Sequence, residues 1–392
     1  MFIIRREASC AIVNTARRRR VLTISGPRGS GKTTLAGILF PQYGYVSLEN
    51  PEALEFARKR PKDFLRHYHG DLVIDEFRFA PELVNHIWDA AADDSRKGRF
   101  ILLTSYRQLK KSASAPWVRP APKKYAATLY LLPLSIRELA AIRVGIDRDE
   151  CICRGFMPGI FTPGADPGEM YRNYYNEYIE RGVRHLIDLD DMSGFGRFMR
   201  LMAGRVGQIM SYRSLAEEVG VSEHTLSSWV FALESSHIMF RLPSYFESFG
   251  RRLVKNPKFY FTDVGLAANL LGLDSPGEVF RDPQVGNLFE NMVIAEALKI
   301  RYNRGRGANL YYYRNRTGLE VDLVLGSARG AFPVEIKASS SFDSSLARNI
   351  ELFRRLSSRI RPGCVVYSGD ERAKEGDVTY VNFKDLRMVM YS

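Results

Sequence analysis

With 392 residues, the chain is longer than one ordinary hydrophobic core allows, so we expect two or three domains. A hydrophobic share of 45% and a charged share of 26% exclude a mainly disordered chain, and the formal charge of +13 favours polyanionic partners such as DNA. No stretch approaches the length of an apolar membrane span, the first apolar run is too short for a signal peptide, and the cysteines lack zinc-ligand spacing, so we expect a cytoplasmic protein without a membrane partner.

The first predicted element is a buried strand over residues 21–24, which leads into a glycine-rich loop and then a helix. The loop, GPRGSGKT, is a full match to the pattern G-x-x-x-x-G-K-[ST] that surrounds nucleotide phosphates with backbone N–H groups. We predict that Lys32 reaches the β- and γ-phosphates of ATP and that the Thr33 hydroxyl binds Mg²⁺. The predicted nucleotide-binding residues are Gly26, Pro27, Arg28, Gly29, Ser30, Gly31, Lys32, Thr33, Thr34 and Asp75.

Two further buried strands end in polar residues. The stretch LVIDE ends at Asp75, which suits the Mg²⁺ shell, and Glu76, which suits the base that activates water in an ATPase. The stretch FILLTS ends at Ser105, which we predict to contact the γ-phosphate or the attacking water. The alternatives are two solvated acids and a strand-end cap. The predicted catalytic residues are thus Lys32, Glu76 and Ser105, in a parallel α/β domain over residues 1–145.

The middle of the chain has helix-turn-helix spacing, with a turn at Gly220 and an N-cap at Ser222. The inner apolar positions are Leu215, Ala216 and Val219 in the first helix and Leu226, Val230 and Leu233 in the second. If the second helix enters the major groove of DNA, then His224, Thr225 and Ser228 face the bases. The alternative is a protein-docking or lid element, and the sequence leaves both open.

Two short predicted strands, HIMFRLP and KFYFTD, follow this pair of helices and complete a winged helix within residues 146–275. Positive charge gathers in or beside the hairpin between them. If the winged helix binds DNA, this hairpin contacts the phosphates through its basic residues, Arg251, Arg252, Lys255 and Lys258.

The C-terminal third is predicted to run helix, three strands, helix, strand. This is the core order of the PD-(D/E)XK restriction-endonuclease-like fold, so we assign that fold to residues 276–392. The first helix carries Glu290 on its apolar face, where a carboxylate is costly unless something pairs with it.

Alternation along the strands places Asp322, Glu335 and Lys337 on one shared face, with Glu290 reaching in from the helix. Clustered carboxylates suit Mg²⁺ or Mn²⁺, so Glu290, Asp322 and Glu335 are predicted metal ligands. The metal would activate water, and Lys337 would position it. The alternative is a degenerate nuclease fold that binds without cutting.

The quoted motifs together resemble prokaryotic AAA-type ATPases that carry a C-terminal domain of unknown function. The segments that carry this resemblance are ISGPRGSGKTTL, LVIDEF, FILLTS, LYLLPLSIREL, SLAEEVGVSEHTLSSWVFALESSHIMFRLP, RRLVKNPKFYFTDVGLAANLLGL and EVDLVL with VEIKAS. They occur in the family's order and cover nearly the whole chain. The resemblance implies ATP binding, a winged-helix middle and a restriction-endonuclease-like end.

One departure from that family concerns an arginine. The family usually has a Gly-Arg pair shortly before the LLPLS strand, whereas this chain has Lys123, Lys124 and Tyr125 there. If that arginine senses the γ-phosphate, Arg107 and Arg137 are candidates to replace it. Because AAA-like ATPases often complete their sites with a neighbour's arginine, the resemblance also implies a homo-oligomer.

We therefore expect an ATP- and Mg²⁺-binding AAA-type ATPase coupled to nucleic acid through a winged helix and a nuclease-like domain, with Mn²⁺ as a further candidate at the C-terminal site. The alternative is a nucleotide-dependent switch or scaffold for protein partners, with an inactive nuclease-like domain.

Overall fold

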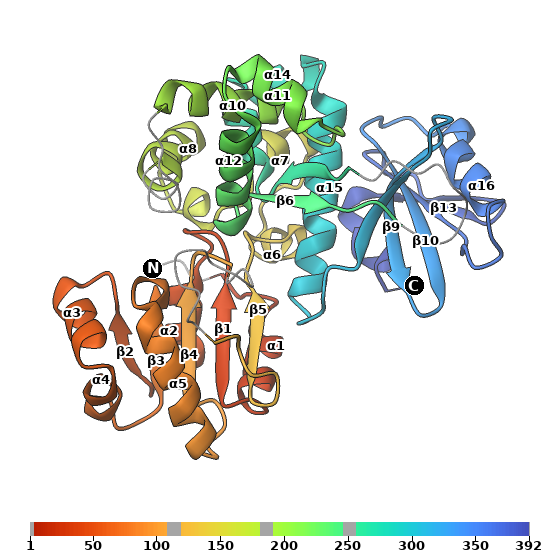
Figure 1. Ribbon diagram of the computed structural model, residues 1–392. Helices are drawn as coiled ribbons and strands as arrows, with labels where there is room; N and C mark the ends of the chain where they lie inside the picture. Colours follow the sequence, from red (N-terminus) through yellow and green to blue (C-terminus); the bar gives the residue numbers. More distant parts are fainter. Residues whose placement is uncertain (1–3, 108–118, 181–190, 246–255, 392) are drawn as a thin grey trace. The chain divides into compact units, whose positions relative to one another are not determined.

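The computed structural model describes residues 4–107, 119–180, 191–245 and 256–391 (Figure 1). The chain divides into two compact units. Unit 1 comprises residues 1–134, 235–237 and 301–306, and unit 2 comprises residues 135–234, 238–300 and 307–392. Of the predicted hairpin residues, Arg251, Arg252 and Lys255 lie outside the described part of the chain. None of the described helices is both long enough and apolar enough to cross a membrane.

Unit 1 is built on a five-stranded sheet in the order β2-β3-β4-β1-β5, and all neighbouring strands are parallel. The strands are β1 (Val21–Ser25), β2 (Gly44–Ser47), β3 (Leu72–Asp75), β4 (Phe100–Thr104) and β5 (Ala126–Tyr130). Ser25 is in register with Thr104 of β4 and with Tyr130 of β5. The carboxyl ends of these strands therefore share one edge of the sheet, where α/β proteins usually bind ligands.

Helices cover both faces of this sheet (Figure 1). Helices α1 (Ser9–Ala16) and α2 (Lys32–Leu39) pack on one face. Helices α3 (Pro51–Lys59), α4 (Pro61–His67) and α5 (Pro81–Asp93) pack on the other, and a short 3₁₀ turn, η1 (Phe77–Phe79), follows β3. The side chains of β1 alternate between the faces, so Leu22 and Ile24 join the α1 and α2 core while Val21 joins the other. The predicted parallel α/β arrangement is present.

The first part of unit 2 is mainly helical. Its elements are α6 (Ile136–Ala141), α7 (Arg148–Arg154), η2 (Pro158–Phe161), α8 (Pro167–Tyr174), a π-helical turn η3 (Tyr175–Glu180), α10 (Met192–Gly204), α11 (Tyr212–Val219), α12 (Glu223–Ser235), β6 (Met239–Leu242), β7 (Lys258–Phe261), α13 (Val264–Leu270) and α14 (Pro276–Arg281). Strands β6 and β7 form a two-stranded antiparallel sheet.

Helices α11 and α12 have the predicted helix-turn-helix spacing. Gly220 ends α11 with a φ of 85°, a left-handed conformation that favours glycine, and the Ser222 hydroxyl accepts a hydrogen bond from the amide of Thr225 at 3.0 Å. All six apolar positions predicted for the inner face of the two helices are buried. The assignment of this part as a winged helix remains a prediction.

The second part of unit 2 is a six-stranded sheet in the order β12-β13-β11-β10-β9-β8, preceded by the long helix α15 (Val285–Tyr302). Its elements are β8 (Leu310–Arg314), β9 (Glu320–Ser327), β10 (Gly330–Lys337), η4 (Ser344–Ala347), α16 (Arg348–Arg354), β11 (Cys364–Tyr367), β12 (Ala373–Glu375), β13 (Val378–Asn382), η5 (Phe383–Asp385) and α17 (Leu386–Val389). The order from α15 to β11 is the predicted one, and the antiparallel pairing of β9 with β10 brings their polar faces together.

Candidate functional site

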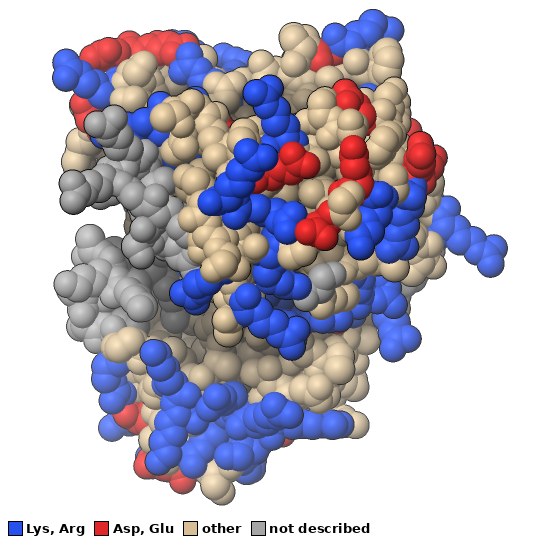
Figure 2. All heavy atoms as spheres, turned by 90° about the vertical axis from the view of Figure 1, so that its right-hand side faces the viewer, with Lys and Arg blue, Asp and Glu red and all other residues tan. Residues whose placement is uncertain are grey.

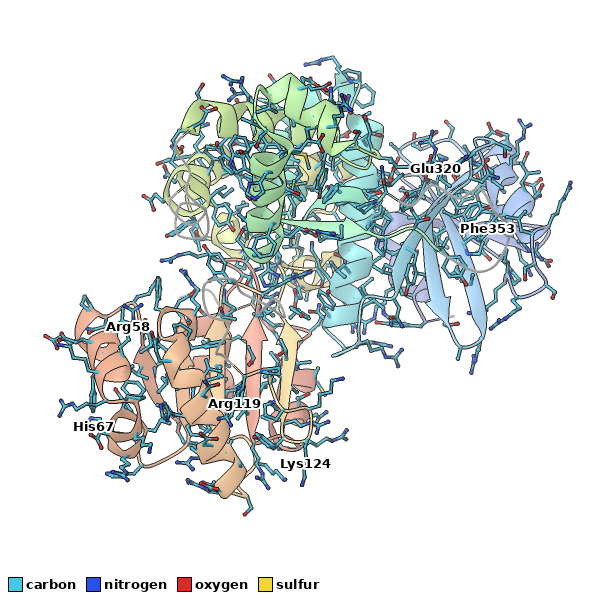
Figure 3. The ribbon with its side chains drawn as sticks, viewed as in Figure 1. Arg58, His67, Arg119, Lys124, Glu320 and Phe353 are labelled. Atoms are coloured by element: carbon cyan, nitrogen blue, oxygen red, sulfur yellow. The ribbon has the colours of Figure 1, made fainter. Side chains whose placement is uncertain are left out.

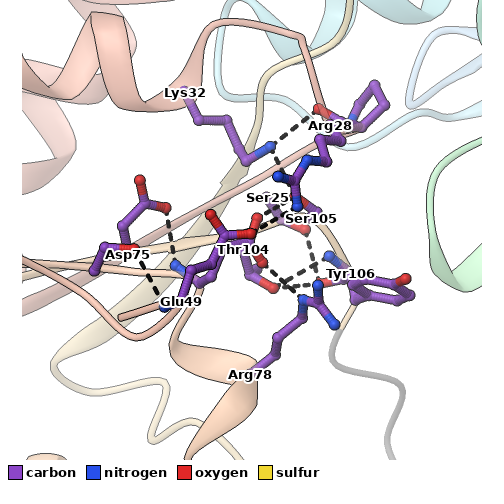
Figure 4. Close-up of polar contacts among 12 residues, drawn as sticks. Ser25, Arg28, Lys32, Glu49, Asp75, Arg78, Thr104, Ser105 and Tyr106 are labelled. Carbon is purple, nitrogen blue, oxygen red and sulfur yellow. Dashed lines mark hydrogen bonds and ion pairs between the residues drawn. The ribbon is translucent and has the colours of Figure 1, made fainter. Parts of the chain in front are cut away.

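The loop between β1 and α2 has the backbone geometry of a phosphate cradle. Figure 4 shows Arg28 and Lys32 with their polar contacts. Gly29 and Gly31 have φ values of 79° and 89°, which a side chain would strain. A Cβ atom at Gly26 would lie 1.9 Å from the carbonyl oxygen of Leu131, so only glycine fits there. The glycines of the motif therefore each have a steric reason. The loop's amides precede the N-terminus of an eight-residue helix, which favours a bound anion.

Lys32 folds back into this loop. Its ammonium donates hydrogen bonds to the carbonyl oxygens of Gly26 at 2.9 Å and Pro27 at 3.0 Å, and to the Ser105 hydroxyl at 3.3 Å. Burial lowers the pKa of Lys32 to about 8, although the Glu76 and Asp75 carboxylates oppose this shift. Phosphate oxygens would give this partly desolvated cation a stronger partner than the two carbonyl groups.

Thr33 and Asp75 form the predicted magnesium-binding pair. The Thr33 hydroxyl donates to Asp75 Oδ2 at 2.6 Å, and the Tyr45 hydroxyl donates to the same oxygen at 3.0 Å. A hydroxyl and a carboxylate are the hard oxygen donors that Mg²⁺ prefers, and Thr33 is exposed, so these residues fit the ion. The shared oxygen and the register of Asp75 with Ser47 on β2 keep the carboxylate at the sheet edge.

Glu76 lies next to this pair in an unusual backbone conformation. Its φ of 47° lies in the left-handed region, which costs a non-glycine residue about 1 kcal/mol or more and is often found at functional sites. Ser105 donates a short hydrogen bond to Glu76 Oε1, and Arg78 Nε donates to Oε2 at 2.7 Å. Burial alone would raise the pKa of Glu76, but the Arg78 and Lys32 charges outweigh it and hold the pKa below its usual value. The carboxylate is therefore ionised at neutral pH.

Of the residues predicted for the nucleotide site, the structure brings all together except Thr34, which lies at the margin of the site. Arg28 pairs with Glu49 at 2.7 Å on the exposed side of the loop. Thr34 is exposed in the first turn of α2 and lies at the margin. Ser105 hydrogen-bonds to both Lys32 and Glu76, whereas the preceding Thr104 hydroxyl caps the strand by accepting from the Tyr106 amide.

Three residues that the sequence motifs did not indicate support this site. Arg6 is buried and donates to the carbonyls of Ser30 and Leu132, each at 2.6 Å, so it ties the phosphate loop to the segment after β5. Arg78 holds Glu76 and stacks between the rings of Phe79 and Tyr106. Only Arg78 could have been suspected from the sequence, because it follows the acidic pair by two residues.

The third is His237, which unit 1 takes from the segment after α12. Its Nε2 lies 2.7 Å from the Ser25 hydroxyl at the end of β1. Burial, together with Arg107 and Lys32, holds the pKa of His237 well below its usual value, so the imidazole is neutral. Arg107 Nε lies 3.4 Å from His237 Nδ1, and its guanidinium lies over the Tyr130 ring. Arg107 and Arg137 are the two candidates to replace the family's arginine. Arg107 lies against His237 and Tyr130, and Arg137 belongs to unit 2.

In the C-terminal part of unit 2, Asp322 and Glu335 lie together beside Lys337, as the alternation predicts. Lys337 Nζ lies 3.3 Å from Asp322 Oδ2 and 2.8 Å from Glu335 Oε2, and the Ile336 amide donates to Asp322 at 2.8 Å. Burial, reinforced by Asp322, raises the pKa of Glu335 well above its usual value. The shared face predicted by alternation is therefore present.

Glu290 has a different partner. Its Oε1 lies 3.0 Å from the ammonium of Lys258 on β7 and accepts a hydrogen bond from Tyr260, and the same ammonium lies 2.7 Å from Glu320 Oε1 (Glu320 is labelled in Figure 3). Lys258 is only 3% exposed, so its predicted contact with DNA phosphate is not available.

Lys258 and Lys337 already partner four acids of this region, Glu290, Glu320, Asp322 and Glu335, where the sequence predicts a divalent cation. In the described ranges, no group of three His, Cys, Asp or Glu residues is placed to hold a metal ion. The predicted ligands Glu290, Asp322 and Glu335 therefore do not form one metal-binding group.

Comparison with known families supports the identification of unit 1. Residues 18–140 match the model of an AAA domain. This match supports an AAA-type ATPase. Residues 146–277 match a domain of unknown function, DUF8612, and residues 285–386 match another, DUF4143.

Two relatives cover most of the chain. The uncharacterized protein Rv2008c of Mycobacterium tuberculosis is 26% identical over 378 residues, which are 95% of this chain and 82% of the relative. The uncharacterized protein MJ1637 of Methanocaldococcus jannaschii is 22% identical over 425 residues, at 95% and 85% coverage.

Among solved structures, the Walker-type ATPase of Pyrococcus abyssi is similar with 12% identity, coverage of 68% of this chain and 96% of that one, and a TM-score of 0.45. The Orc1 protein of Aeropyrum pernix, solved in complex with DNA, is similar with 14% identity, coverage of 70% and 93%, and a TM-score of 0.28. Both likenesses are distant and show no function for this chain.

Proposed function

We propose that unit 1 binds ATP with Mg²⁺ between the phosphate loop and Asp75 and hydrolyses it with Glu76 as the base. The observation that carries this proposal is the continuous chain of contacts from Lys32 through Ser105 to Glu76, next to the Thr33–Asp75 pair. It joins the group that would bind the γ-phosphate to the group that would orient water.

Each residue has a defined task in this proposal. Lys32 exchanges the carbonyls of Gly26 and Pro27 for phosphate oxygens, while Thr33 and Asp75 hold Mg²⁺, which neutralises charge on the phosphates. Glu76 is ionised and orients the attacking water, and Ser105 keeps its carboxylate in place. Arg78 donates to the second oxygen of Glu76 and holds the carboxylate from that side.

We further propose that ATP hydrolysis is coupled to nucleic acid and that a second copy of the chain supplies the arginine this site lacks. The formal charge of +13 supports the first point, and the engagement of Arg107 by His237 supports the second.

A second candidate function concerns the C-terminal domain. We propose that this part, whose element order agrees with a restriction-endonuclease-like core, binds a partner without cutting nucleic acid. The observation that favours this is the Lys258 ammonium, which lies between Glu290 and Glu320 where a nuclease would need free carboxylates.

The test of ATP binding compares Lys32→Ala with the unchanged chain, using a fluorescent ATP analogue and Mg²⁺. We expect the affinity to fall at least about a hundredfold, because a charged hydrogen-bond partner of the phosphates is lost (about 3 kcal/mol). Lys59→Ala, which removes an exposed lysine paired only with Glu55, is the matched control and should bind normally. Equal affinity of Lys32→Ala and the unchanged chain would refute the site.

A further inference from the structure

The net positive charge of this protein comes from one of its two units. Unit 1 contains 26 Lys and Arg against 12 Asp and Glu, whereas unit 2 contains 31 against 32. The difference is therefore +14 for unit 1 and −1 for unit 2. Unit 2 includes the predicted winged helix and nuclease-like domain, so neither the net charge nor the attraction for polyanions that follows from it originates there.

Within unit 1, exposed basic residues gather where the strands begin, at the sheet edge opposite the phosphate loop. Arg19 donates hydrogen bonds to the carbonyls of Lys123 at 3.1 Å and Lys124 at 2.9 Å, so the stretches before β1 and β5 lie side by side. The Gly98 amide donates to the Arg19 carbonyl at 2.6 Å, which adds the stretch before β4. We call the exposed residues of these stretches the basal basic edge: Arg17, Arg18, Lys97, Lys123 and Lys124.

The same basic surface continues along α1. Gly305 packs against Ala11 of α1 and Leu129 of β5, and its neighbours Arg304 and Arg306 are both exposed. Helix α1 has no acidic residue along its length of about 12 Å. Figure 2 shows Lys and Arg side chains gathered along the lower end of unit 1, where Lys124 is labelled in Figure 3.

Nearby acidic residues do not neutralise the basal basic edge. Asp94 forms ion pairs with Arg96 at 2.7 Å and Arg99 at 2.6 Å, and Asp89 forms one with Arg119 at 2.6 Å. Within the described part of the chain, the five residues of the edge form no ion pair, so their charges face solvent.

We propose that the basal basic edge, extended along α1, binds the phosphate backbone of nucleic acid. This inference rests on the proposed coupling to nucleic acid and moves the contact from the winged helix to the ATPase unit. Guanidinium groups suit phosphates because they can form paired hydrogen bonds. The large hydrophobic side chains that the described structure exposes lie on other elements, so this surface lacks the apolar anchors that a membrane-binding surface uses. Contacts of this kind hold the backbone without reading the sequence.

The test uses two charge-reversal variants of the full chain. The first, Arg17→Glu/Arg18→Glu/Lys123→Glu/Lys124→Glu, changes the basal basic edge. The matched control changes four exposed basic residues of unit 2 and shifts the net charge equally: Arg316→Glu/Arg355→Glu/Arg372→Glu/Lys374→Glu. Fluorescence anisotropy with a labelled DNA duplex of about 20 base pairs, between about 50 and 200 mM salt, gives the affinity and its salt dependence.

We expect the edge variant to lose at least about tenfold in DNA affinity, with a salt slope shallower by about 3, and the control to bind like the unchanged chain. An equal loss in both variants, or tight binding of phosphatidylserine vesicles in place of DNA, would overturn the proposal. ATP turnover without DNA should be the same in both variants, so a failure here is distinguishable from a failure of the proposed ATPase.

Discussion

The buried ammonium of Lys258 lies 3.0 Å from Glu290 Oε1 and 2.7 Å from Glu320 Oε1, and Glu290 is one of the carboxylates that the sequence assigns to a metal ion. A strand that the sequence places in a DNA-binding hairpin thus supplies a fixed cation to the C-terminal domain. Lys337 partners Asp322 and Glu335 in the same way, so these acids have lysine counter-charges within unit 2.

Replacing Lys258 should therefore destabilise unit 2. We expect Lys258→Met to lower the free energy of unfolding by about 3 to 5 kcal/mol, because Glu290 and Glu320 lose a buried counter-charge. Urea unfolding measures the change. The double variant Lys258→Met/Glu290→Gln should recover part of the loss, since it removes the charge of Glu290, whereas Glu320 keeps its ion pair with Arg314. A loss below about 1 kcal/mol would show that the buried pair contributes little.

The same arrangement predicts that the unchanged chain neither binds Mn²⁺ without nucleotide nor cuts DNA with it. Electron paramagnetic resonance of Mn²⁺ and a plasmid-nicking assay measure the two properties. Cleavage by the unchanged chain that disappears in Glu335→Ala/Lys337→Ala would contradict this prediction and restore the nuclease assignment.

Arg78 should determine the pH below which the rate of ATP turnover falls, which is the acid limb of the pH profile. Arg78 is the leading charge that holds the pKa of Glu76 below its usual value, so Arg78→Gln should raise this pKa and move the acid limb toward higher pH. The lowered pKa of Glu76 also stabilises the fold of unit 1. This contribution is fully present above the unfolded pKa of about 4.5, and it is lost as the pH falls through the lower pKa of the folded state. A pH profile of phosphate release checks the shift. Arg66→Gln, at an exposed arginine, is the control. If Arg78→Gln leaves the acid side of the pH profile unchanged, Arg78 does not set the pKa of Glu76.

Lys32 should take up a proton when ATP binds in mildly alkaline solution. Its pKa of about 8 leaves much of it neutral at a pH of about 8.5, and phosphates should raise that pKa. Calorimetry in buffers of different ionisation enthalpy measures the uptake. Lys32→Arg keeps its charge at this pH and should show none. Equal proton uptake by both proteins would place the titrating group elsewhere.

The phosphate loop should tolerate no side chain at its first glycine. Gly26→Ala would place a methyl group 1.9 Å from the Leu131 carbonyl oxygen, so ATP affinity should fall at least about tenfold as the loop shifts. Gly37→Ala, on an open face of α2, is the matched control and should bind ATP normally, with a gain in stability of up to about 1 kcal/mol. Normal ATP binding by Gly26→Ala would show that the loop adapts.

The nucleotide site could be predicted because each of its residues lies in a short motif that is recognisable by itself. The phosphate loop is one continuous motif. Asp75 ends β3, and Glu76 and Ser105 directly follow β3 and β4, two buried strands that are recognisable by their apolar runs. Parallel pairing then places these strand ends at one edge whatever their separation in the chain.

Two of the supporting residues could not be predicted, because they depend on contacts between distant segments. Arg6 and His237 lie 24 and 212 residues from their partners Ser30 and Ser25, and no periodicity links them. For Lys258 the sequence favours a contact with DNA, because a lysine beside a hairpin is usually exposed. Only the approach of α15 and β9 to β7 shows that it is buried among acids.

We propose that Glu76 activates water for ATP hydrolysis while Lys32, Thr33 and Asp75 bind the nucleotide. The most direct measurement is single-turnover ATP cleavage by Glu76→Gln beside its ATP affinity. We predict unchanged or tighter ATP binding and a rate of cleavage at least about a hundredfold lower, because the amide cannot accept the proton of water. Cleavage at the rate of the unchanged chain would contradict the assignment.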